Sequence, residues 1–219
     1  MDADAHWLEC DVQVSADRVP FVCHDVSLKR TAGLGLDITA TPAEKLDSIS
    51  VGEPERFGNR FATIKLARLT QLVHWLLQQT DVTQFVEIKR QSLHHHGNEP
   101  TVTAIMRELQ PALDRCVVIS FDHACLELAR RQGARRIGWA VETANEQFQR
   151  IAADLQPDYL FTDEKLFVRM RTAMPGSWRW IVYHTESPER VLELADQGAH
   201  MVETNDIGTL LRNPRLQQA

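Results

Sequence analysis

Short apolar runs rich in β-branched residues recur along the chain, and segments with apolar residues at helical spacing follow most of them. Such runs are typical of buried strands, whereas apolar residues three and four positions apart indicate helices that bury one face. The predicted strands are Trp7–Val12, Gln84–Lys89, Val117–Phe121, Arg136–Val141, Asp158–Phe161, Arg179–Tyr183 and Ala199–Glu203. Strands that alternate with helices form parallel sheets with crossover connections, so the pattern predicts an α/β fold.

The segments between these strands supply the helices. The predicted helices are Leu69–Gln79, Glu99–Leu109, Ala124–Gln132, Ala144–Leu155, Glu164–Ala173 and Pro188–Gln197. Thr143 followed by Glu146 predicts a capping box at the start of one of them. Ser187 before Pro188 predicts an N-cap followed by proline in the first turn.

Residues 26–66 interrupt this alternation, because they are rich in Thr, Gly, Pro and charged residues and contain no long periodic segment. We interpret them as an insertion between a strand and its helix, and long insertions of this kind are usually functional. The chain contains no internal repeat or low-complexity linker. We therefore predict one domain over residues 1–219.

Composition and charge narrow the classes of partner. The chain has 24 Lys and Arg against 30 Asp and Glu, a formal net charge of −6, so nucleic acid is an improbable partner. Its longest apolar runs are far shorter than the roughly 20 residues of a membrane-spanning helix, and its acidic start lacks the features of a secretory signal. Four cysteines without C-x-x-C spacing favour a reduced, cytoplasmic protein.

Two acids share one face of the first predicted strand. Glu9 and Asp11 are two residues apart, and side chains in a strand alternate between faces. Inside a barrel these carboxylates would repel each other and lose solvation, which makes a bound cation their natural counter-charge. The alternative is a strand end at which both acids reach solvent.

Glu87, Lys89 and His24 complete a candidate site. Glu87 and Lys89 share one face at the carboxyl end of a predicted parallel strand, the end that carries active sites in barrels, although a surface ion pair is the alternative. His24 follows a short apolar run, and a lone histidine is more often structural than catalytic. Three carboxylates without cysteine favour Mg2+ or Ca2+, a lysine beside such an ion favours phosphate, and a histidine can transfer protons near neutral pH. Phosphoester hydrolysis is therefore our hypothesis.

Sequence motifs support this chemistry. The chain reads E-C-D-V over Glu9–Val12, S-A-D-R-V-P-F-V-C-H-D over Ser15–Asp25, L-K-R-T over Leu28–Thr31 and E-I-K over Glu87–Lys89. In these motifs the chain resembles the glycerophosphodiester phosphodiesterases, whose pattern runs E-x-D-V, T-x-D-G-x-x-V-x-x-H-D and L-x-R-T. Weaker matches continue the resemblance at Ser120–Asp122 and Trp180–Tyr183. The resemblance covers nearly the whole chain.

The resemblance implies a TIM-type (β/α)8 barrel that hydrolyses glycerophosphodiesters to sn-glycerol 3-phosphate and an alcohol. It implies the following roles: Glu9, Asp11 and Glu87 bind the divalent metal, His24 is one of two catalytic histidines, Lys89 contacts the phosphate, and Trp180 lines the pocket. Alternatives are a lysophospholipase D or sphingomyelinase-D-like enzyme, or a catalytically silent barrel. The implied partner is a small-molecule glycerophosphodiester, without integral membrane association.

One departure from the family pattern concerns the start of the chain. The family's H-R-G, which the resemblance places on the first barrel strand with the other catalytic histidine, does not occur in this sequence. Seven predicted strands also fall one short of a closed barrel. We therefore expect the first strand and helix of the barrel to be missing from the chain as given. We also expect Trp7–Val12 and Ala199–Glu203 to have unpaired backbone edges.

Overall fold

The computed structural model describes residues 5–143, 145–170 and 176–216. These residues form two compact units. The first unit contains Trp7–Ser120 and Ala124–Arg135. The second contains Phe121–His123 and the chain from Arg136 onward, together with the first residues up to His6.

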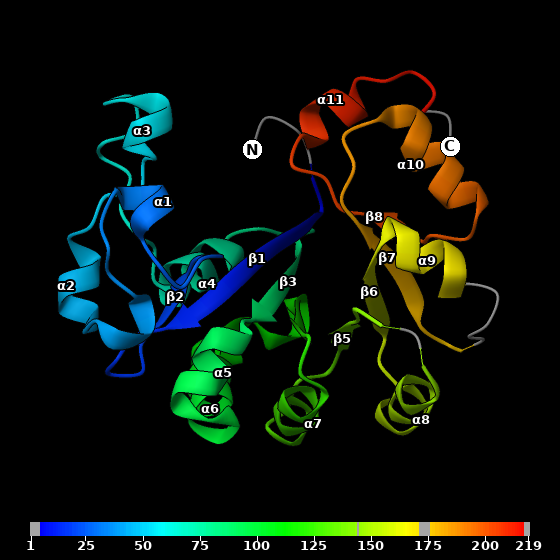
Figure 1. The fold of residues 1–219 in the computed structure, drawn as a ribbon, viewed down its shortest axis with the longest axis horizontal. Helices are drawn as coiled ribbons and strands as arrows, with labels where there is room; N and C mark the ends of the chain where they lie inside the picture. The colour runs from blue at the N-terminus through cyan, green and yellow to red at the C-terminus, as the bar shows by residue number, and fades with distance from the viewer. Residues whose placement is uncertain (1–4, 144, 171–175, 217–219) are drawn as a thin grey trace. The chain divides into compact units, whose positions relative to one another are not determined.

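Four strands form the sheet of the first unit in the order β2-β1-β3-β4. They are β1 (Trp7–Val14), β2 (Pro20–Val22), β3 (Thr83–Ile88) and β4 (Cys116–Ser120). β1 and β3 are parallel, as are β3 and β4, whereas β2 runs antiparallel to β1 (Figure 1). All five residues of β4 are buried, as expected for a parallel strand with both faces covered.

In the first unit, α4 (Leu69–Leu76), α6 (Asn98–Leu109) and α7 (His123–Arg131) lie close to predicted helices, and the other helices are short. The short helices are α1 (Lys29–Ala32), η1 (Ile38–Ala40), α2 (Ala43–Asp47), α3 (Pro54–Phe57), α5 (Arg90–His96) and η2 (Gln110–Arg115). In α4 the buried residues Leu69, Val73 and Leu76 recur at spacings of four and three, which explains why this segment forms an amphipathic helix.

The insertion folds around a small hydrophobic core that it shares with β2. Phe21 of β2 is fully buried in this cluster together with Leu28, Ile38 and Leu46. The three short helices α1, α2 and α3 and the 3-10 helix η1 all belong to residues 26–66 (Figure 1). The absence of a long periodic segment in the sequence is therefore matched by short helices in the structure.

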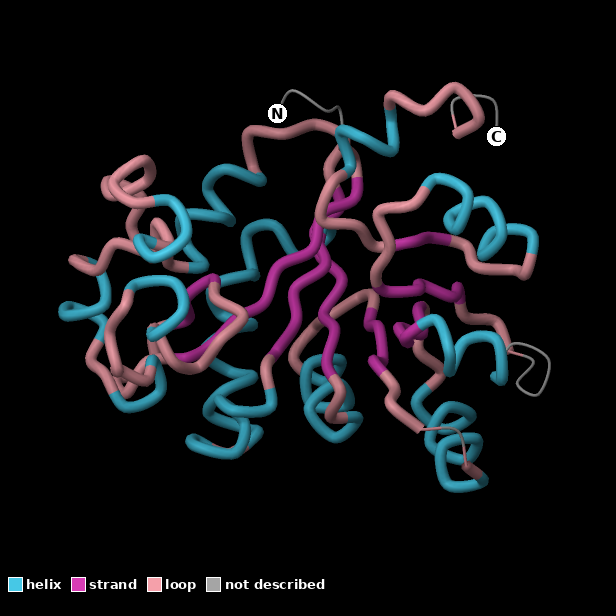
Figure 2. The backbone as a smooth tube through the Cα atoms, turned by 45° about the horizontal axis from the view of Figure 1, so that its top comes forward, coloured by secondary structure: helices cyan, strands magenta, loops and turns pink. Residues whose placement is uncertain are grey.

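The second unit repeats the strand–helix alternation. Its strands are β5 (Ile137–Ala140), β6 (Tyr159–Asp163), β7 (Arg179–Tyr183) and β8 (Met201–Val202), which pair in that order and are all parallel. Its helices are α8 (Glu146–Leu155), α9 (Glu164–Met170), α10 (Pro188–Asp196) and α11 (Ile207–Leu211). Figure 2 shows the helices of each unit as connections between its strands. The predicted α/β class is confirmed.

One local prediction was wrong, one was confirmed and one was contradicted only in part. The N-cap of α8 is Asn145, whose side chain accepts the Phe148 N–H at 2.9 Å, so Thr143 does not form the predicted capping box. Ser187 does cap α10. The edge of Trp7–Val12 was expected to be unpaired, and this is contradicted at Val12, which pairs with Val22 of β2 in an antiparallel hairpin.

Candidate active site

Three carboxylates converge where β1 and β3 lie side by side. Glu9 and Asp11 alternate with Cys10 along β1, and the parallel register places Asp11 opposite Glu87 of β3. One oxygen of each acid lies within 4.8 Å of one oxygen of each of the others. Strand alternation together with the register produces this convergence.

Lys89 is the cation of this cluster. It directly follows β3, and its backbone N–H donates to the Val12 carbonyl of β1. Its ammonium Nζ lies 3.1 Å from Asp11 Oδ1 and 2.9 Å from Glu87 Oε1, and the three side chains are between 11% and 17% exposed. The two strands thus bring a lysine between two acids at a largely buried position.

The charges of this cluster do not balance. Three carboxylates and one ammonium give a formal charge of −2 when all are ionised. Burial raises the pKa of Glu87, and the charge of Asp11 adds to this effect, while the charge of Lys89 opposes it. Burial alone would lower the pKa of Lys89, but its attraction to Glu87 and Asp11 raises it. The ammonium therefore stays protonated. The remaining negative charge of the cluster can be neutralised by a further cation.

His24 lies in the bend after β2, in the same unit as the carboxylates. Its side chain is 65% exposed, and its Nδ1 is 2.7 Å from Oδ1 of the neighbouring Asp25. The ring lines an open cleft of about 590 Å³, together with residues of α1, α3 and α5. The cleft is lined by His24, Asp25, Val26, Ser27, Lys29, Arg30, Glu55 and Gln91. The histidine is therefore accessible to a ligand, as a proton-transfer group must be.

Trp180 lies on β7 in the second unit and is 6% exposed. Its ring makes edge-to-face contacts with Phe167 of α9 and with Trp178, at centroid distances of 5.7 and 6.4 Å. These contacts account for its burial by packing alone. The pocket-lining role implied by resemblance stays a prediction.

Sequence reasoning missed the residues that surround His24. Asp25 and Arg30 were recognised only as parts of motifs, and Gln13 was not recognised at all. In the structure the Gln13 amide donates to the His24 carbonyl at 3.1 Å, and Arg30 Nε donates to Asp25 Oδ2 at 2.7 Å. Gln13 continues the alternation of Glu9 and Asp11 along β1, and this was the signal that could have pointed to it.

Comparison with known proteins identifies the family. The model of the glycerophosphoryl diester phosphodiesterase family matches residues 1–209. A glycerophosphodiester phosphodiesterase from Caldanaerobacter subterraneus is 25% identical over 220 residues, which cover 96% of this chain and 86% of that protein.

Solved structures share the fold. A phosphodiesterase from Oleispira antarctica, determined with the product sn-glycerol-3-phosphate, matches with a TM-score of 0.80 at 20% identity, over 99% of this chain and 85% of that one. A protein from Silicibacter pomeroyi matches with a TM-score of 0.82 at 19% identity, over 95% and 83% of the two chains. The likeness confirms the predicted TIM-type architecture, and the family match covers most of the sequence. The chain belongs to the glycerophosphoryl diester phosphodiesterase family.

Proposed function

We propose that this protein hydrolyses glycerophosphodiesters to sn-glycerol 3-phosphate and an alcohol, with a divalent metal ion held by Glu9, Asp11 and Glu87. Family membership supports the reaction. The observation that carries the assignment of the site is the meeting of three carboxylates within 4.8 Å, next to a buried lysine and in one unit with an exposed histidine.

The donor set fits a hard divalent cation. Carboxylate oxygens are the ligands that Mg2+ and Ca2+ prefer, and the formal charge of −2 matches one such ion. When bound, the ion supplies charge neutralisation at a phosphoryl oxygen and polarises the phosphorus toward attack. Mg2+ and Ca2+ are both compatible with these donors.

Lys89 would bind the phosphate. An ammonium has three N–H donors, and its contacts with Asp11 and Glu87 use two of them. The third can donate to a phosphate oxygen and stabilise the charge that builds on it during attack. Because the two acids fix the ammonium, little reorganisation is needed when substrate binds.

His24 would transfer a proton. Its exposed ring can reach a substrate in the cleft, and imidazole gains and loses a proton near neutral pH. It would take one of the two proton-transfer roles that the reaction needs, either deprotonating the attacking nucleophile or protonating the departing alcohol. The substrate alcohol would occupy the cleft beside it.

The first test measures the metal site without substrate. Thermal melts with Mg2+ or Ca2+ should show stabilisation, by about 2.7 kcal/mol at a metal concentration 100 times the dissociation constant. Asp11→Asn should remove the effect. Asp114→Asn is the matched control, because it removes an equal charge from an exposed pair with Arg135. A metal response that survives Asp11→Asn would place the ion elsewhere.

The second test measures the reaction. Release of sn-glycerol 3-phosphate from glycerophosphocholine should depend on the added metal, and His24→Ala should reduce it by about 10²-fold or more. Lysophosphatidylcholine and sphingomyelin serve as comparison substrates. Preference for either lipid would contradict the proposed substrate class, and absence of turnover on all three would favour a silent barrel.

We also propose a cytoplasmic location. All four cysteines lie in the described ranges and are thiols, and burial raises the pKa of Cys23 to about 11, which leaves it unreactive. Within the described residues, no helix is both long and apolar enough to cross a bilayer. Cell fractionation with a tagged chain tests the location, and recovery outside the cytoplasmic fraction would contradict it.

A further inference from the structure

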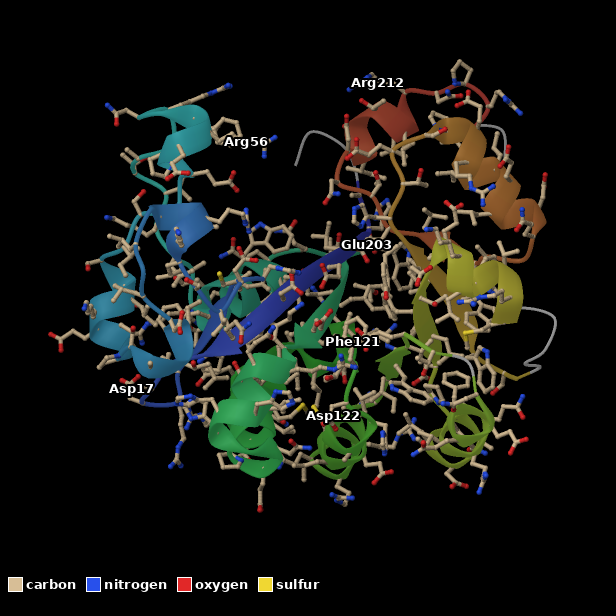
Figure 3. All side chains as sticks on the ribbon, in the orientation of Figure 1. Asp17, Arg56, Phe121, Asp122, Glu203 and Arg212 are labelled. Atoms are coloured by element: carbon tan, nitrogen blue, oxygen red, sulfur yellow. The ribbon has the colours of Figure 1, made fainter. Side chains whose placement is uncertain are left out.

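A chain of charged side chains begins at the His24 ring and ends in the insertion. His24 Nδ1 is 2.7 Å from Asp25 Oδ1, and Arg30 Nε is 2.7 Å from the other oxygen, Asp25 Oδ2. Arg30 in turn donates from NH1 to Glu53 Oε1 at 2.8 Å. Arg56, which Figure 3 labels on α3, lies 3.6 Å from Glu53 Oε2. Both oxygens of Asp25 are thus engaged, one by the imidazole and one by the guanidinium.

We propose that Asp25, held by Arg30, is a positioning residue that fixes His24 as the Nδ1–H tautomer and leaves Nε2 as the bare proton acceptor. A carboxylate only accepts hydrogen bonds, so a neutral ring that contacts it through Nδ1 must carry its hydrogen there. The other ring nitrogen then has a free lone pair. An unconstrained exposed ring has no partner that selects this tautomer.

The ionised state of Asp25 follows from the same contacts. Partial burial alone would raise its pKa, but the hydrogen bonds from Arg30 and His24 together lower it. Arg30 therefore orients the carboxylate and further favours its ionised form. Once the ring takes up a proton at Nε2, the same carboxylate stabilises the imidazolium that forms.

The backbone of His24 is fixed as well. Gln13 is fully buried, and its side-chain nitrogen donates to the His24 carbonyl at 3.1 Å. Ser92 Oγ donates to the Gln13 oxygen at 2.6 Å and accepts the Val14 N–H at 2.8 Å. His24 is therefore fixed at the main chain from the sheet side and at the ring from the insertion side. Such double support defines the direction of Nε2.

This inference rests on the proposed function only for its catalytic consequence, since the tautomer can be measured without substrate. The experiment is a two-bond ¹H–¹⁵N correlation spectrum of the full chain at a pH where the rings are neutral. His24→Gln identifies the His24 signals among those of the nine histidines. We expect a protonated-type signal at Nδ1 and a bare-type signal at Nε2.

Two variants give the comparison. Asp25→Asn should shift the His24 tautomer toward Nε2–H, whereas the matched control Asp114→Asn should leave it as in the wild type. Arg30→Gln should weaken the preference. A His24 ring that is mainly Nε2–H in the wild type, or unchanged in Asp25→Asn, would overturn the proposal. The wild-type spectrum decides the point even if a variant fails to fold.

Kinetics then test the catalytic consequence on glycerophosphocholine. Asp25→Asn should lower kcat by about 10-fold or more and change KM less than twofold, because it misplaces a proton acceptor and leaves the phosphate contacts intact. In a His24→Ala background the same substitution should have no further effect. Additive losses would contradict action through His24. A wild type that hydrolyses none of the substrates would disprove the proposed function without changing the tautomer result.

Discussion

At the scale of single residues, Lys89 neutralises part of the negative charge of the site. Its ammonium contacts both Asp11 and Glu87, which face each other across the β1–β3 ladder. Without it, two partly buried carboxylates would meet with no cation between them. One partner of a buried ion pair is costly to remove, because the charges left behind have lost both water and their counter-ion.

Lys89→Met should therefore destabilise the metal-free protein by about 3 kcal/mol. Urea unfolding in the presence of a chelator measures this loss. Lys65→Met is the matched control, because Lys65 Nζ donates to the Ser48 carbonyl at an exposed position, and its loss should cost less than about 1 kcal/mol. Equal losses in the two variants would show that the Lys89 pairs contribute nothing beyond a surface contact.

The main acids of the site were predictable from sequence, and the support of His24 was not. Glu9 and Asp11 share a face by strand alternation, and Glu87 lies at a strand end, so local rules suffice to bring them together. Asp25 is adjacent to His24 and lies outside any strand. Its side chain meets the ring only because the backbone bends there and Arg30 reaches back from α1, which no spacing rule encodes.

At the scale of elements, one carboxylate helps to hold the insertion against the sheet. Asp17 lies in the turn between β1 and β2, and its Oδ1 accepts the Ser15 hydroxyl at 2.6 Å and the Ala43 N–H at 2.9 Å. Figure 3 shows Asp17 beside the helices of the insertion. Ala43 is the first residue of α2, so Asp17 links this helix to the strand pair that leads to His24.

Asp17→Ala should lower the free energy of unfolding by about 1 kcal/mol, because both donors lose their acceptor at an exposed site. The Ser15 and Ala43 hydrogen bonds lower the pKa of Asp17 below its usual value. Its contribution is therefore complete above the unfolded value of about 3.9 and is lost as the pH falls through the folded pKa.

Chemical unfolding at several pH values tests the direction of this pH dependence. The stability difference between the wild type and Asp17→Ala should shrink as the pH falls below about 4, and Asp17→Asn, which keeps an acceptor oxygen, should lose less at neutral pH. A difference that grows on acidification would contradict the assignment.

The start of α8 shows how two adjacent signals compete. Thr143 and Glu146 match the capping-box pattern, yet Asn145 holds the N-cap position and accepts the Phe148 N–H. Asparagine is among the strongest N-cap residues, and one cap position suffices. Helix position was therefore predictable to within a few residues, whereas the choice between neighbouring cap residues needed the backbone.

Asn145→Ala should cost about 1 kcal/mol of stability, and Asn145→Asp should restore most of it, since aspartate accepts the same hydrogen bond. Thermal melts of the two variants measure the effect. Thr143→Ala, which should be close to neutral, is the control. A larger loss of stability in Thr143→Ala than in Asn145→Ala would show that Thr143 is the N-cap of α8.

For the molecule as a whole, the proposed metal site belongs to one compact unit. Glu9, Asp11, Glu87 and Lys89 all come from the unit that contains Trp7–Ser120, and so does His24. A ligand that binds native contacts suppresses the local openings that break them. Mg2+ or Ca2+ should thus slow hydrogen exchange of amides in β1 and β3 that exchange by local opening.

Amides of β6 and β7 that exchange by local opening should keep their rates, because none of the proposed ligands lies in their unit. Hydrogen exchange read by mass spectrometry, with and without metal, separates the two regions, and Asp11→Asn should abolish the protection. Protection confined to β6 and β7 would contradict the proposed ligands.

The parallel strands of the fold were predictable at nearly their true positions, because most are short apolar runs followed by a helix and β1 alternates apolar and polar residues. β2 was not. It has only three residues, begins with Pro20, and is a strand only because Val12, Gln13 and Val14 of β1 offer it an antiparallel partner. Short edge strands depend on the neighbour that they pair with more than on their own sequence.

The pairing of β2 with β1 restricts where this protein can change in length during evolution or engineering. A single residue added to the Ser15–Val19 turn would slip the ladder by one position and exchange Phe21 and Val22 between the two faces, which would remove Phe21 from the core of the insertion. The residues of the insertion that line the cleft beside His24 would be displaced at the same time. Residues added beyond Gly58, at the exposed end of α3, disturb no ladder. Homologues should therefore vary in length after Gly58 and keep the length of the Ser15–Val19 turn constant.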